Sequence, residues 1–239
     1  MIPKKPKSES PAARVATLPA GVQSRFLQGL GPRDLEAVLT AATHRQLFAN
    51  SVVTAQDHDA DHMFLLIDGR ARHFFMTEDG QKCLLHWLTP GDVFGGAAFT
   101  IEPRKYLLST ETVEASSVLV WDRATMRGIA AQHPRVAENV LLVAYEYMTW
   151  YIADHVSLTR NSASERLAQV LIRLSGVIGR TVPGGVEFDA TNEELANAAN
   201  ITPFTASRLL NRWQRERAVE KHRGKIVVRS PGRLLPKAV

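Results

Sequence analysis

Residues 191–213 of this 239-residue chain, TNEELANAANITPFTASRLLNRW, follow the pattern of two short helices joined by a tight turn. Thr191 followed three residues later by Glu194 forms a capping box, which predicts that a helix begins there. Asn200 falls in the turn, where asparagine tolerates a left-handed backbone. Thr202 can cap a second helix, and the proline after it suits the first helical position. The segment therefore predicts a helix, a turn and a second helix.

The second helix has one apolar face and one polar, basic face. Its apolar stripe follows the i, i+3, i+4, i+7 spacing of a buried helix face and consists of Ala206, Leu209, Leu210 and Trp213. The opposite face carries Phe204, Arg208, Asn211 and Arg215. This layout is typical of a helix-turn-helix, in which the second helix enters the major groove of DNA. An ordinary surface hairpin of two amphipathic helices is the alternative.

The positive charge of the chain is concentrated near its C-terminus. Residues 200–239 contain ten Lys and Arg against two acidic residues, a net charge of +8, whereas residues 1–199 contain 19 against 22, a net charge of −3. A segregated basic region is the electrostatic footprint of phosphate binding. Residues 220–229 (EKHRGKIVVR) predict a hairpin with a turn at the glycine, a wing that places Arg223 and Lys225 near backbone phosphates. The sequence therefore predicts DNA binding.

Composition limits the remaining classes of protein. At 239 residues with 45% apolar side chains, the chain is long enough for two domains with separate cores. The single cysteine, Cys83, cannot form an intramolecular disulfide or supply the four ligands of an iron–sulfur cluster, and it suits a reducing cytoplasm. Its alternating neighbours predict burial in a strand.

The longest strongly apolar run, residues 140–145, is far shorter than the roughly 20 residues of a membrane span. Residues 1–20 lack the apolar core of a signal peptide, so we expect a disordered tail and a cytoplasmic location.

Between residues 46 and 121 the pattern indicates many short strands. Residues 21–45 before them are expected to be helical, with a helix beginning near Pro32. Asp-Gly pairs at 68–69 and 79–80 are strong hairpin signals. Strands at this spacing predict a small antiparallel barrel or jelly roll. The expected strands cover residues 63–67, 70–76, 82–88, 110–115 and 118–121.

Residues 134–160 predict one long helix. Its length of roughly 40 Å exceeds what a small domain usually covers, so we expect a homodimer formed through this helix. Packing against the barrel is the alternative for one of its sides. Ser162 with Glu165 makes another capping box, which predicts a hinge near Asn161. The expected dimer seam alternates spacings of four and three and consists of Val136, Val140, Val143, Tyr147, Trp150 and Asp154.

The order of these parts resembles the Crp/Fnr family of bacterial transcription regulators. The resemblance covers the chain after residue 20 and rests on four motifs: LLIDG at 65–69, PGDVFG at 90–95, RLA at 166–168 and TASRLL at 205–210. It implies an α+β protein with four parts. These are a disordered tail (1–20), an antiparallel β-roll or jelly-roll sensor domain similar to cyclic nucleotide-binding domains (21–133), a dimerisation helix (134–160) and a winged helix-turn-helix domain (161–239).

The resemblance implies a homodimeric regulator that is not an enzyme. It would bind an inverted repeat in double-stranded DNA, with half-sites about one helical turn apart, and act with RNA polymerase and without a membrane. Arg208 matches the arginine that contacts a guanine, a contact worth roughly 1–3 kcal/mol of discrimination. Phe204 stands where relatives often place a base-reading glutamate, so it offers only an apolar contact, such as to a thymine methyl. The residues expected on DNA are Thr202, Thr205, Ser207, Arg208, Asn211 and Arg212, with Arg223 and Lys225 of the wing.

The effector pocket departs from that of the cyclic-AMP receptor proteins of the family. Their glutamate for the ribose corresponds here to Gly96, and their Arg-Ser for the phosphate corresponds to Ser109 and Thr110. Burying a phosphate without a cationic partner is costly, so the expected effector is not cyclic AMP. Arg104 and Lys105 are the alternative partners of a phosphate.

Bulky aromatic side chains on the long helix add to this departure. They either fill the pocket as core or stack on a flat apolar effector, and no cofactor is identified. The candidate pocket residues are Gly95, Gly96, Ser109, Thr110, Tyr147, Trp150 and Tyr151.

Two other functions remain open. One is an effector-independent DNA-binding regulator in which the roll is only a dimer scaffold. The other is a metal-dependent, cupin-like enzyme with a DNA-binding domain, suggested by residues 57–62 (DHDADH) with His73 and His86. The chain lacks the His-x-His of cupins, and a polar loop is the simpler interpretation, so no metal site or catalytic residue is predicted.

Overall fold

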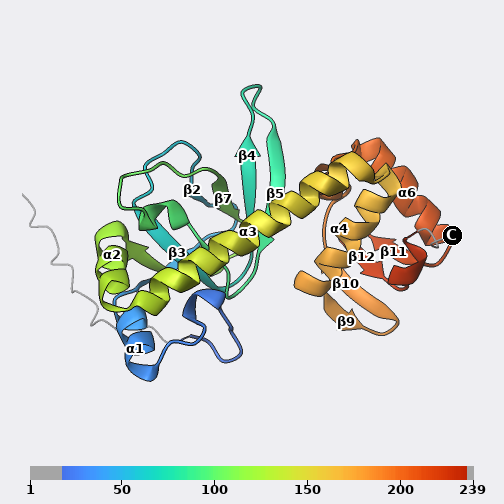
Figure 1. Ribbon diagram of the computed structural model, residues 1–239. Coiled ribbons are helices and arrows are strands. Elements are labelled where there is room, and N and C mark those ends of the chain that lie inside the picture. The colour runs from blue at the N-terminus through green and yellow to red at the C-terminus, as the bar shows by residue number, and fades with distance from the viewer. Residues whose placement is uncertain (1–17, 236–239) are drawn as a thin grey trace, which may run out of the picture.

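The computed structural model describes residues 18–235, so most of the tail predicted over residues 1–20 lies outside the described residues. The chain forms a β-roll and a smaller C-terminal domain, and the long helix α3 (Pro134–Arg160) extends from the first to the second (Figure 1). No helix in the described part of the chain combines the length and the apolarity that crossing a membrane requires.

The roll consists of two four-stranded antiparallel sheets, which confirms the predicted antiparallel β architecture. The first has the order β1-β8-β3-β6, with strands β1 (Thr43–Leu47), β3 (His62–Asp68), β6 (Val93–Phe94) and β8 (Ser116–Asp122). The second has the order β2-β7-β4-β5, with strands β2 (Val52–Thr54), β4 (Ala71–Met76), β5 (Lys82–Leu88) and β7 (Ser109–Thr112).

The Asp-Gly pair at 79–80 lies at the turn of the β4–β5 hairpin, as predicted. The pair at 68–69 connects β3 and β4, which do not pair with each other, so the hairpin predicted there was wrong. Gly69 has a φ of +85°, and a Cβ there would stand 2.7 Å from the carbonyl oxygen of Ala115. Only glycine fits this backbone and this approach. This turn takes the chain from β3 in the first sheet to β4 in the second sheet.

The segment before the roll is less helical than the sequence predicted. The helical elements are the short 3-10 turn η1 (Arg25–Leu27) and helix α1 (Pro32–Thr40), which begins at Pro32 as expected. The prediction was wrong for residues 43–45, which belong to β1. Pairing with β8, in the register Thr43 to Val120, overrides the local preference.

The core of the roll lies between the sheets and helix α2 (Arg123–Gln132), with the 3-10 turn η2 (Gly96–Phe99) at its edge. Trp121 is fully buried and its indole Nε1 donates to the carbonyl oxygen of Val38 at 2.8 Å. Phe26 packs edge-on against the same ring at 5.5 Å. Cys83, by contrast, is exposed on β5, so the predicted burial was wrong.

Helix α3 has the predicted bounds, but its predicted seam faces the roll rather than a second helix. Val136 is buried in the roll core, and Val140, Val143 and Tyr147 pack against that core. Asn139 fixes the helix further, because its Nδ2 donates to two carbonyl oxygens of the η1 segment at 2.9 Å each. These positions therefore pack against the barrel, which was the alternative for one side of the helix.

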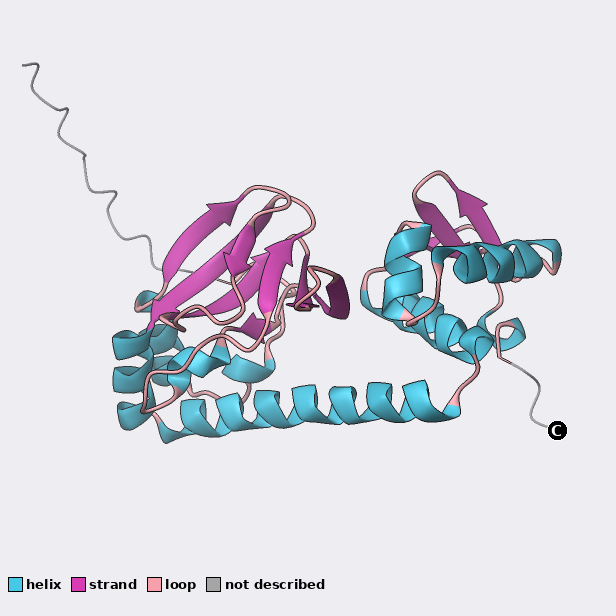
Figure 2. Cartoon of the chain, turned by 90° about the horizontal axis from the view of Figure 1, so that it is seen from above, coloured by secondary structure: helices cyan, strands magenta, loops and turns pink. Residues whose placement is uncertain are grey.

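A second apolar stripe on α3 is exposed. Leu141, Tyr145, Met148 and Ile152 alternate spacings of four and three, and their exposed fractions lie between 59% and 71%. Figure 2 shows both domains on one side of α3, which leaves the other side uncovered. Within the single chain, none of the described residues covers this stripe.

The C-terminal domain packs helices against a four-stranded sheet of order β11-β12-β10-β9. Helix α4 begins after Ser162, whose capping box with Glu165 is formed as predicted, and the preceding Asn161 is extended. The elements are α4 (Ala163–Val177), β9 (Arg180–Val182), β10 (Gly185–Asp189), α5 (Asn192–Ala198), α6 (Pro203–Arg215), β11 (Val219–His222), β12 (Lys225–Val228) and the 3-10 turn η3 (Pro231–Arg233).

Candidate DNA interface and effector pocket

Helices α5 and α6 form the predicted helix-turn-helix. The capping box of Thr191 and Glu194 starts α5, and the Thr202 hydroxyl accepts from the Thr205 amide at 3.1 Å to start α6. Asn200 between them has a φ of +48°. Each local signal in this segment thus has its predicted structural counterpart.

Arg166 of α4 holds this turn in place. Its guanidinium donates to the carbonyl oxygens of Ala199 at 2.8 Å and Asn200 at 3.1 Å, and to that of Asn161 at 2.8 Å. These charge-assisted bonds satisfy carbonyls that the turn leaves without helical partners. One side chain therefore joins the segment after α3 to the turn before α6.

Helix α6 buries one face and exposes the other. Ala206, Leu209, Leu210 and Trp213 are buried in the domain core, as predicted. On the opposite face, Phe204 is 78% exposed, and Arg208 and Asn211 are exposed. Within residues 18–235, Arg208 has no ion pair and no side-chain hydrogen bond. Its guanidinium is therefore available to an external acceptor.

Other predicted DNA contacts already have partners inside the chain. Arg212 donates to the Ser164 hydroxyl at 2.8 Å, and Lys225 pairs with Glu187 at 2.9 Å. The Thr202 and Thr205 hydroxyls bond each other at 2.9 Å. Ser207 is half-buried, and Arg223 is exposed at the tip of the β11–β12 hairpin, where Gly224 has a φ of +73°.

In the roll, two imidazoles and two aromatic rings of α3 form a compact cluster. His73 of β4 and His86 of β5 are directly paired across the hairpin. The His86 ring stacks on Trp150 at 4.3 Å, and Tyr147 packs edge-on against both imidazoles at 5.8 and 5.9 Å. Burial lowers the pKa of His73 to about 4, and burial with the nearby His73 and Arg173 lowers the pKa of His86 to about 3. Both rings are therefore neutral at physiological pH.

Three of the predicted pocket residues converge on this cluster. Thr110 Oγ1 lies 3.0 Å from Nδ1 of His73, and Tyr147 and Trp150 cover the two imidazoles. The sequence did not assign His73 and His86 to the pocket. The sequence placed both histidines on strands of one predicted hairpin. Alternation of residues along a strand does not show which face of the hairpin packs against a distant helix.

Of the other predicted pocket residues, Ser109 also contacts the cluster, because its backbone hydrogen-bonds the His73 imidazole. Gly95 directly precedes η2 and has a φ of +77°, and a Cβ there would meet the His62 carbonyl oxygen at 2.6 Å. Gly96 faces open space. The Ser109 hydroxyl accepts from the Gln56 amide at 3.0 Å. The Tyr151 hydroxyl is buried without a hydrogen-bond partner in the described part of the chain, and burial raises the pKa of Tyr151 to about 12.

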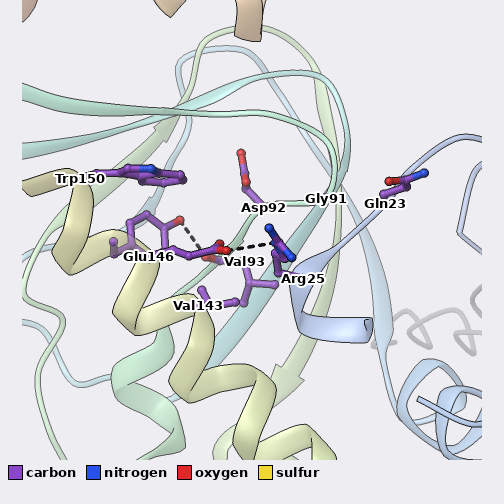
Figure 3. A pocket seen from close by; sticks show the side chains of 9 residues that line it. Gln23, Arg25, Gly91, Asp92, Val93, Val143, Glu146 and Trp150 are labelled. Carbon is purple, nitrogen blue, oxygen red and sulfur yellow. Dashed lines mark hydrogen bonds and ion pairs between the residues drawn. The ribbon is translucent and has the colours of Figure 1, made fainter. Parts of the chain in front are cut away.

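A small cavity remains beside the cluster, between the segment before α1, the Pro-Gly-Asp turn and α3 (Figure 3). Its volume is about 90 Å³. Glu146 pairs with Arg25 at 3.0 Å, and Tyr147 donates to the Val93 carbonyl oxygen at 3.0 Å. Burial raises the pKa of Asp92, although its carboxylate accepts from the Thr89 amide at 2.7 Å.

This cavity is smaller than a typical ligand site. Sites for drug-sized ligands typically enclose about 300–1,000 Å³, and the one cation among the lining residues, Arg25, is already paired. Arg104 is exposed on the loop before β7 and pairs with Glu102 at 3.4 Å, and Lys105 is exposed beside it. Neither side chain reaches the cavity lining in this conformation.

The opposite face of the β4–β5 hairpin contacts the helix-turn-helix. Arg72 donates to Glu111 of β7 at 2.8 Å and to Glu194 of α5 at 2.8 Å. Trp87, the strand partner of Arg72, is 4% exposed and belongs to the core of the C-terminal domain. Glu194 therefore caps α5 with one carboxylate oxygen and binds the roll with the other.

The polar segment 57–62 is a loop that leads into β3, as the simpler interpretation held. Asp57 has a φ of +64°, and Asp59 forms an isolated bridge with Lys105. In the described residues, no group of three or more His, Cys, Asp and Glu side chains is arranged to hold a metal ion.

A sheet roll with a buried polar cluster, joined to a winged helix-turn-helix, defines a DNA-binding regulator with an effector-sensing domain. Residues 44–133 match the cyclic nucleotide-binding domain, and residues 165–236 match the Crp-like helix-turn-helix domain. The chain belongs to the Crp/Fnr family of transcriptional regulators.

Among curated relatives, the transcriptional activatory protein AadR of Rhodopseudomonas palustris is 24% identical over 194 residues, 80% of this chain and 79% of that protein. The CRP-like cAMP-activated global transcriptional regulator of Mycobacterium tuberculosis is 24% identical over 188 residues, 77% of this chain and 83% of that protein. Among solved structures, FixK2 of Bradyrhizobium japonicum superposes with a TM-score of 0.70 at 21% identity, covering 81% of this chain and 95% of that chain.

The buried imidazoles predict a loss of stability in mild acid. The unfolded chain takes up a proton on each histidine near pH 6.5, whereas the folded protein takes up none on His73 until about pH 4. The free energy of unfolding should therefore fall by about 1–2 kcal/mol per buried histidine between about pH 7.5 and about pH 5.

Urea unfolding at the two pH values measures this loss. His86→Phe keeps a ring against Trp150 and should remove one of the two contributions, so the stability of the variant depends less on pH. His58→Gln, on the exposed loop, is the matched control and should leave the pH dependence unchanged. An unchanged pH dependence in His86→Phe would contradict the assignment.

Proposed function

We propose that this protein is a homodimeric, sequence-specific transcriptional regulator whose two α6 helices read an inverted repeat in double-stranded DNA. The observation that carries the proposal is the exposed face of α6, where the unpaired Arg208 lies in the basic C-terminal domain. Arg208 reads a guanine, and the remaining predicted contacts supply hydroxyl, amide or charge to phosphates and base edges. Arg212 and Lys225 do so by exchanging their present partners for phosphates.

Arg208→Ala should lower the affinity for the best operator by about 5- to 150-fold, the loss that corresponds to roughly 1–3 kcal/mol of base discrimination. Fluorescence anisotropy against a duplex selected from a randomised pool measures it. Arg215→Ala, an exposed cation of the same helix, should instead weaken specific and non-specific binding alike. For the parent, log K should fall linearly with log salt concentration. An unchanged affinity in Arg208→Ala would refute the reading role.

The exposed stripe of α3 supports the homodimer. An apolar heptad stripe is covered in solution by a second helix with the same pattern, and a two-fold dimer places two recognition helices on two half-sites. The predicted seam is occupied by the roll, so the dimer uses Leu141, Tyr145, Met148 and Ile152 instead.

Met148→Glu should shift the protein in native mass spectrometry from twice the 26.4 kDa chain mass to the chain mass, because a charge in the seam is desolvated on pairing. Operator affinity should fall with it. Ala153→Glu, an exposed residue outside the stripe, should stay dimeric. A dimeric Met148→Glu would place the subunit interface elsewhere. The same spectra report any small molecule or metal retained by the parent protein.

We propose further that the effector is not cyclic AMP. The cavity beside the imidazole cluster is small, and its cation is paired within the chain. Relatives include a regulator named for activation by cyclic AMP, but the ribose and phosphate positions here are Gly96, Ser109 and Thr110.

Millimolar cyclic AMP should therefore leave both Tm and operator affinity unchanged. A ligand at about 100 times its Kd would raise the free energy of unfolding by about 2.7 kcal/mol, a readily measured shift. Differential scanning fluorimetry with AMP as the matched control ligand makes the comparison. A rise in Tm with cyclic AMP alone would overturn this part of the proposal.

The named relatives are transcriptional regulators, which supports a role without catalysis and RNA polymerase as the second partner. A DNA-bound regulator of this kind acts in the cytoplasm of a bacterium.

The specific observation in favour of an effector-independent regulator is the filled cluster around His86 and Trp150. A retained small molecule that changes operator affinity would exclude that second function.

A further inference from the structure

Phe204 is a large apolar side chain on the face of α6 that the domain does not cover. Its exposed fraction is 78%, whereas Trp213 on the opposite face is 1% exposed. Single exposed apolar residues are common on protein surfaces, so exposure alone assigns no role. The position of Phe204 in the helix is what distinguishes it.

Phe204 is the second residue of α6, and the backbone that carries it is firmly held. Thr202 caps the helix through the Thr205 amide at 3.1 Å, and Pro203 occupies the first helical position with a restricted φ. The N-terminal residues of a recognition helix are those that contact base edges. The Phe204 ring therefore projects from a rigid helix start in the direction of the DNA.

Phe204 also has a defined spacing from Arg208. The two residues are four positions apart, so they lie on the same face of the helix. Four residues advance the helix by about 6 Å, and successive bases of one strand rise by about 3.4 Å. The two side chains therefore reach bases that are about two pairs apart.

The chemistry of the ring restricts what it can contact in the major groove. A phenyl group neither donates nor accepts a hydrogen bond, and the purine edges and the cytosine amino group are polar. The 5-methyl group of thymine is the apolar feature of the major-groove edge of the bases. Aromatic or aliphatic wedges that open base steps act from the minor groove, which this helix does not enter.

We propose that Phe204 reads the 5-methyl group of a thymine about two base pairs from the guanine contacted by Arg208. This inference rests on the proposed function of α6 as the reading helix. At this position Phe204 makes an apolar contact where relatives often place a base-reading glutamate. The operator should therefore require a methyl group at the contacted base rather than a hydrogen-bonding group.

Deoxyuridine tests this role, because it keeps every donor and acceptor of thymine and lacks the methyl group. In the duplex selected by the parent protein, each thymine is replaced by deoxyuridine, one at a time. One position per half-site should lower the affinity by about fourfold, the ratio that corresponds to one buried methyl group. In Phe204→Ala, which lacks the ring, the same substitution should leave the affinity unchanged.

A second pair of duplexes separates methyl recognition from DNA shape, which also depends on sequence. At that position, 5-methylcytosine paired with guanine should bind the parent protein more tightly than cytosine paired with guanine. Phe204→Ala should not distinguish the two. Asn211→Ala, exposed on the same face, is the matched control and should retain the deoxyuridine effect.

The outcomes separate this inference from the proposed function. A flat deoxyuridine scan with a weakened Arg208→Ala would overturn the role of Phe204 and leave the reading helix intact. Full operator affinity in Arg208→Ala would overturn both. Thermal unfolding of Phe204→Ala should match the parent, because the ring makes no core contact; an unchanged methyl effect in this folded variant would also refute the assignment.

Discussion

The strands β4 and β5 connect the imidazole cluster, the long helix and the helix-turn-helix, because successive residues of a strand point to opposite faces. The pair His73 and His86 faces α3, and the neighbouring pair Arg72 and Trp87 faces the C-terminal domain. The two contacts are one residue apart in a single hydrogen-bonded register. The imidazoles therefore cannot slide along the hairpin without moving the side chains that hold α5.

A register shift in this hairpin extends the contact with the C-terminal domain. The pairing jumps between His73 with His86 and Phe74 with Leu84, which leaves one residue of β5 unpaired. Without such a bulge, positions three apart in a strand face opposite sides of the sheet. Because of it, Leu84 joins Trp87 against the core of the C-terminal domain. The bulge thus widens an interface that the ion pair of Arg72 with Glu194 anchors at one point.

Local signals predicted the helix-turn-helix almost completely, whereas contacts between distant segments were not predicted. Caps, the turn at Asn200 and the two faces of α6 depend on residues at most a few positions apart, which the sequence displays directly. The seam of α3 was assigned to the wrong partner because a heptad pattern records an apolar face and not what covers it. The pocket assignment likewise missed His86, whose partner Trp150 lies 64 positions away.

The same cluster limits how an effector can act on the roll. Ligands shift a conformational equilibrium only by binding one state better than the other. In the conformation described, the space beside α3 holds the stacked His86 and Trp150 rings, and the remaining cavity of about 90 Å³ has room for about three water molecules. An effector larger than this cavity has to displace some of its lining side chains, and these include Tyr147 and Trp150. Both rings pack on His86, and the next residue of β5, Trp87, contacts the C-terminal core.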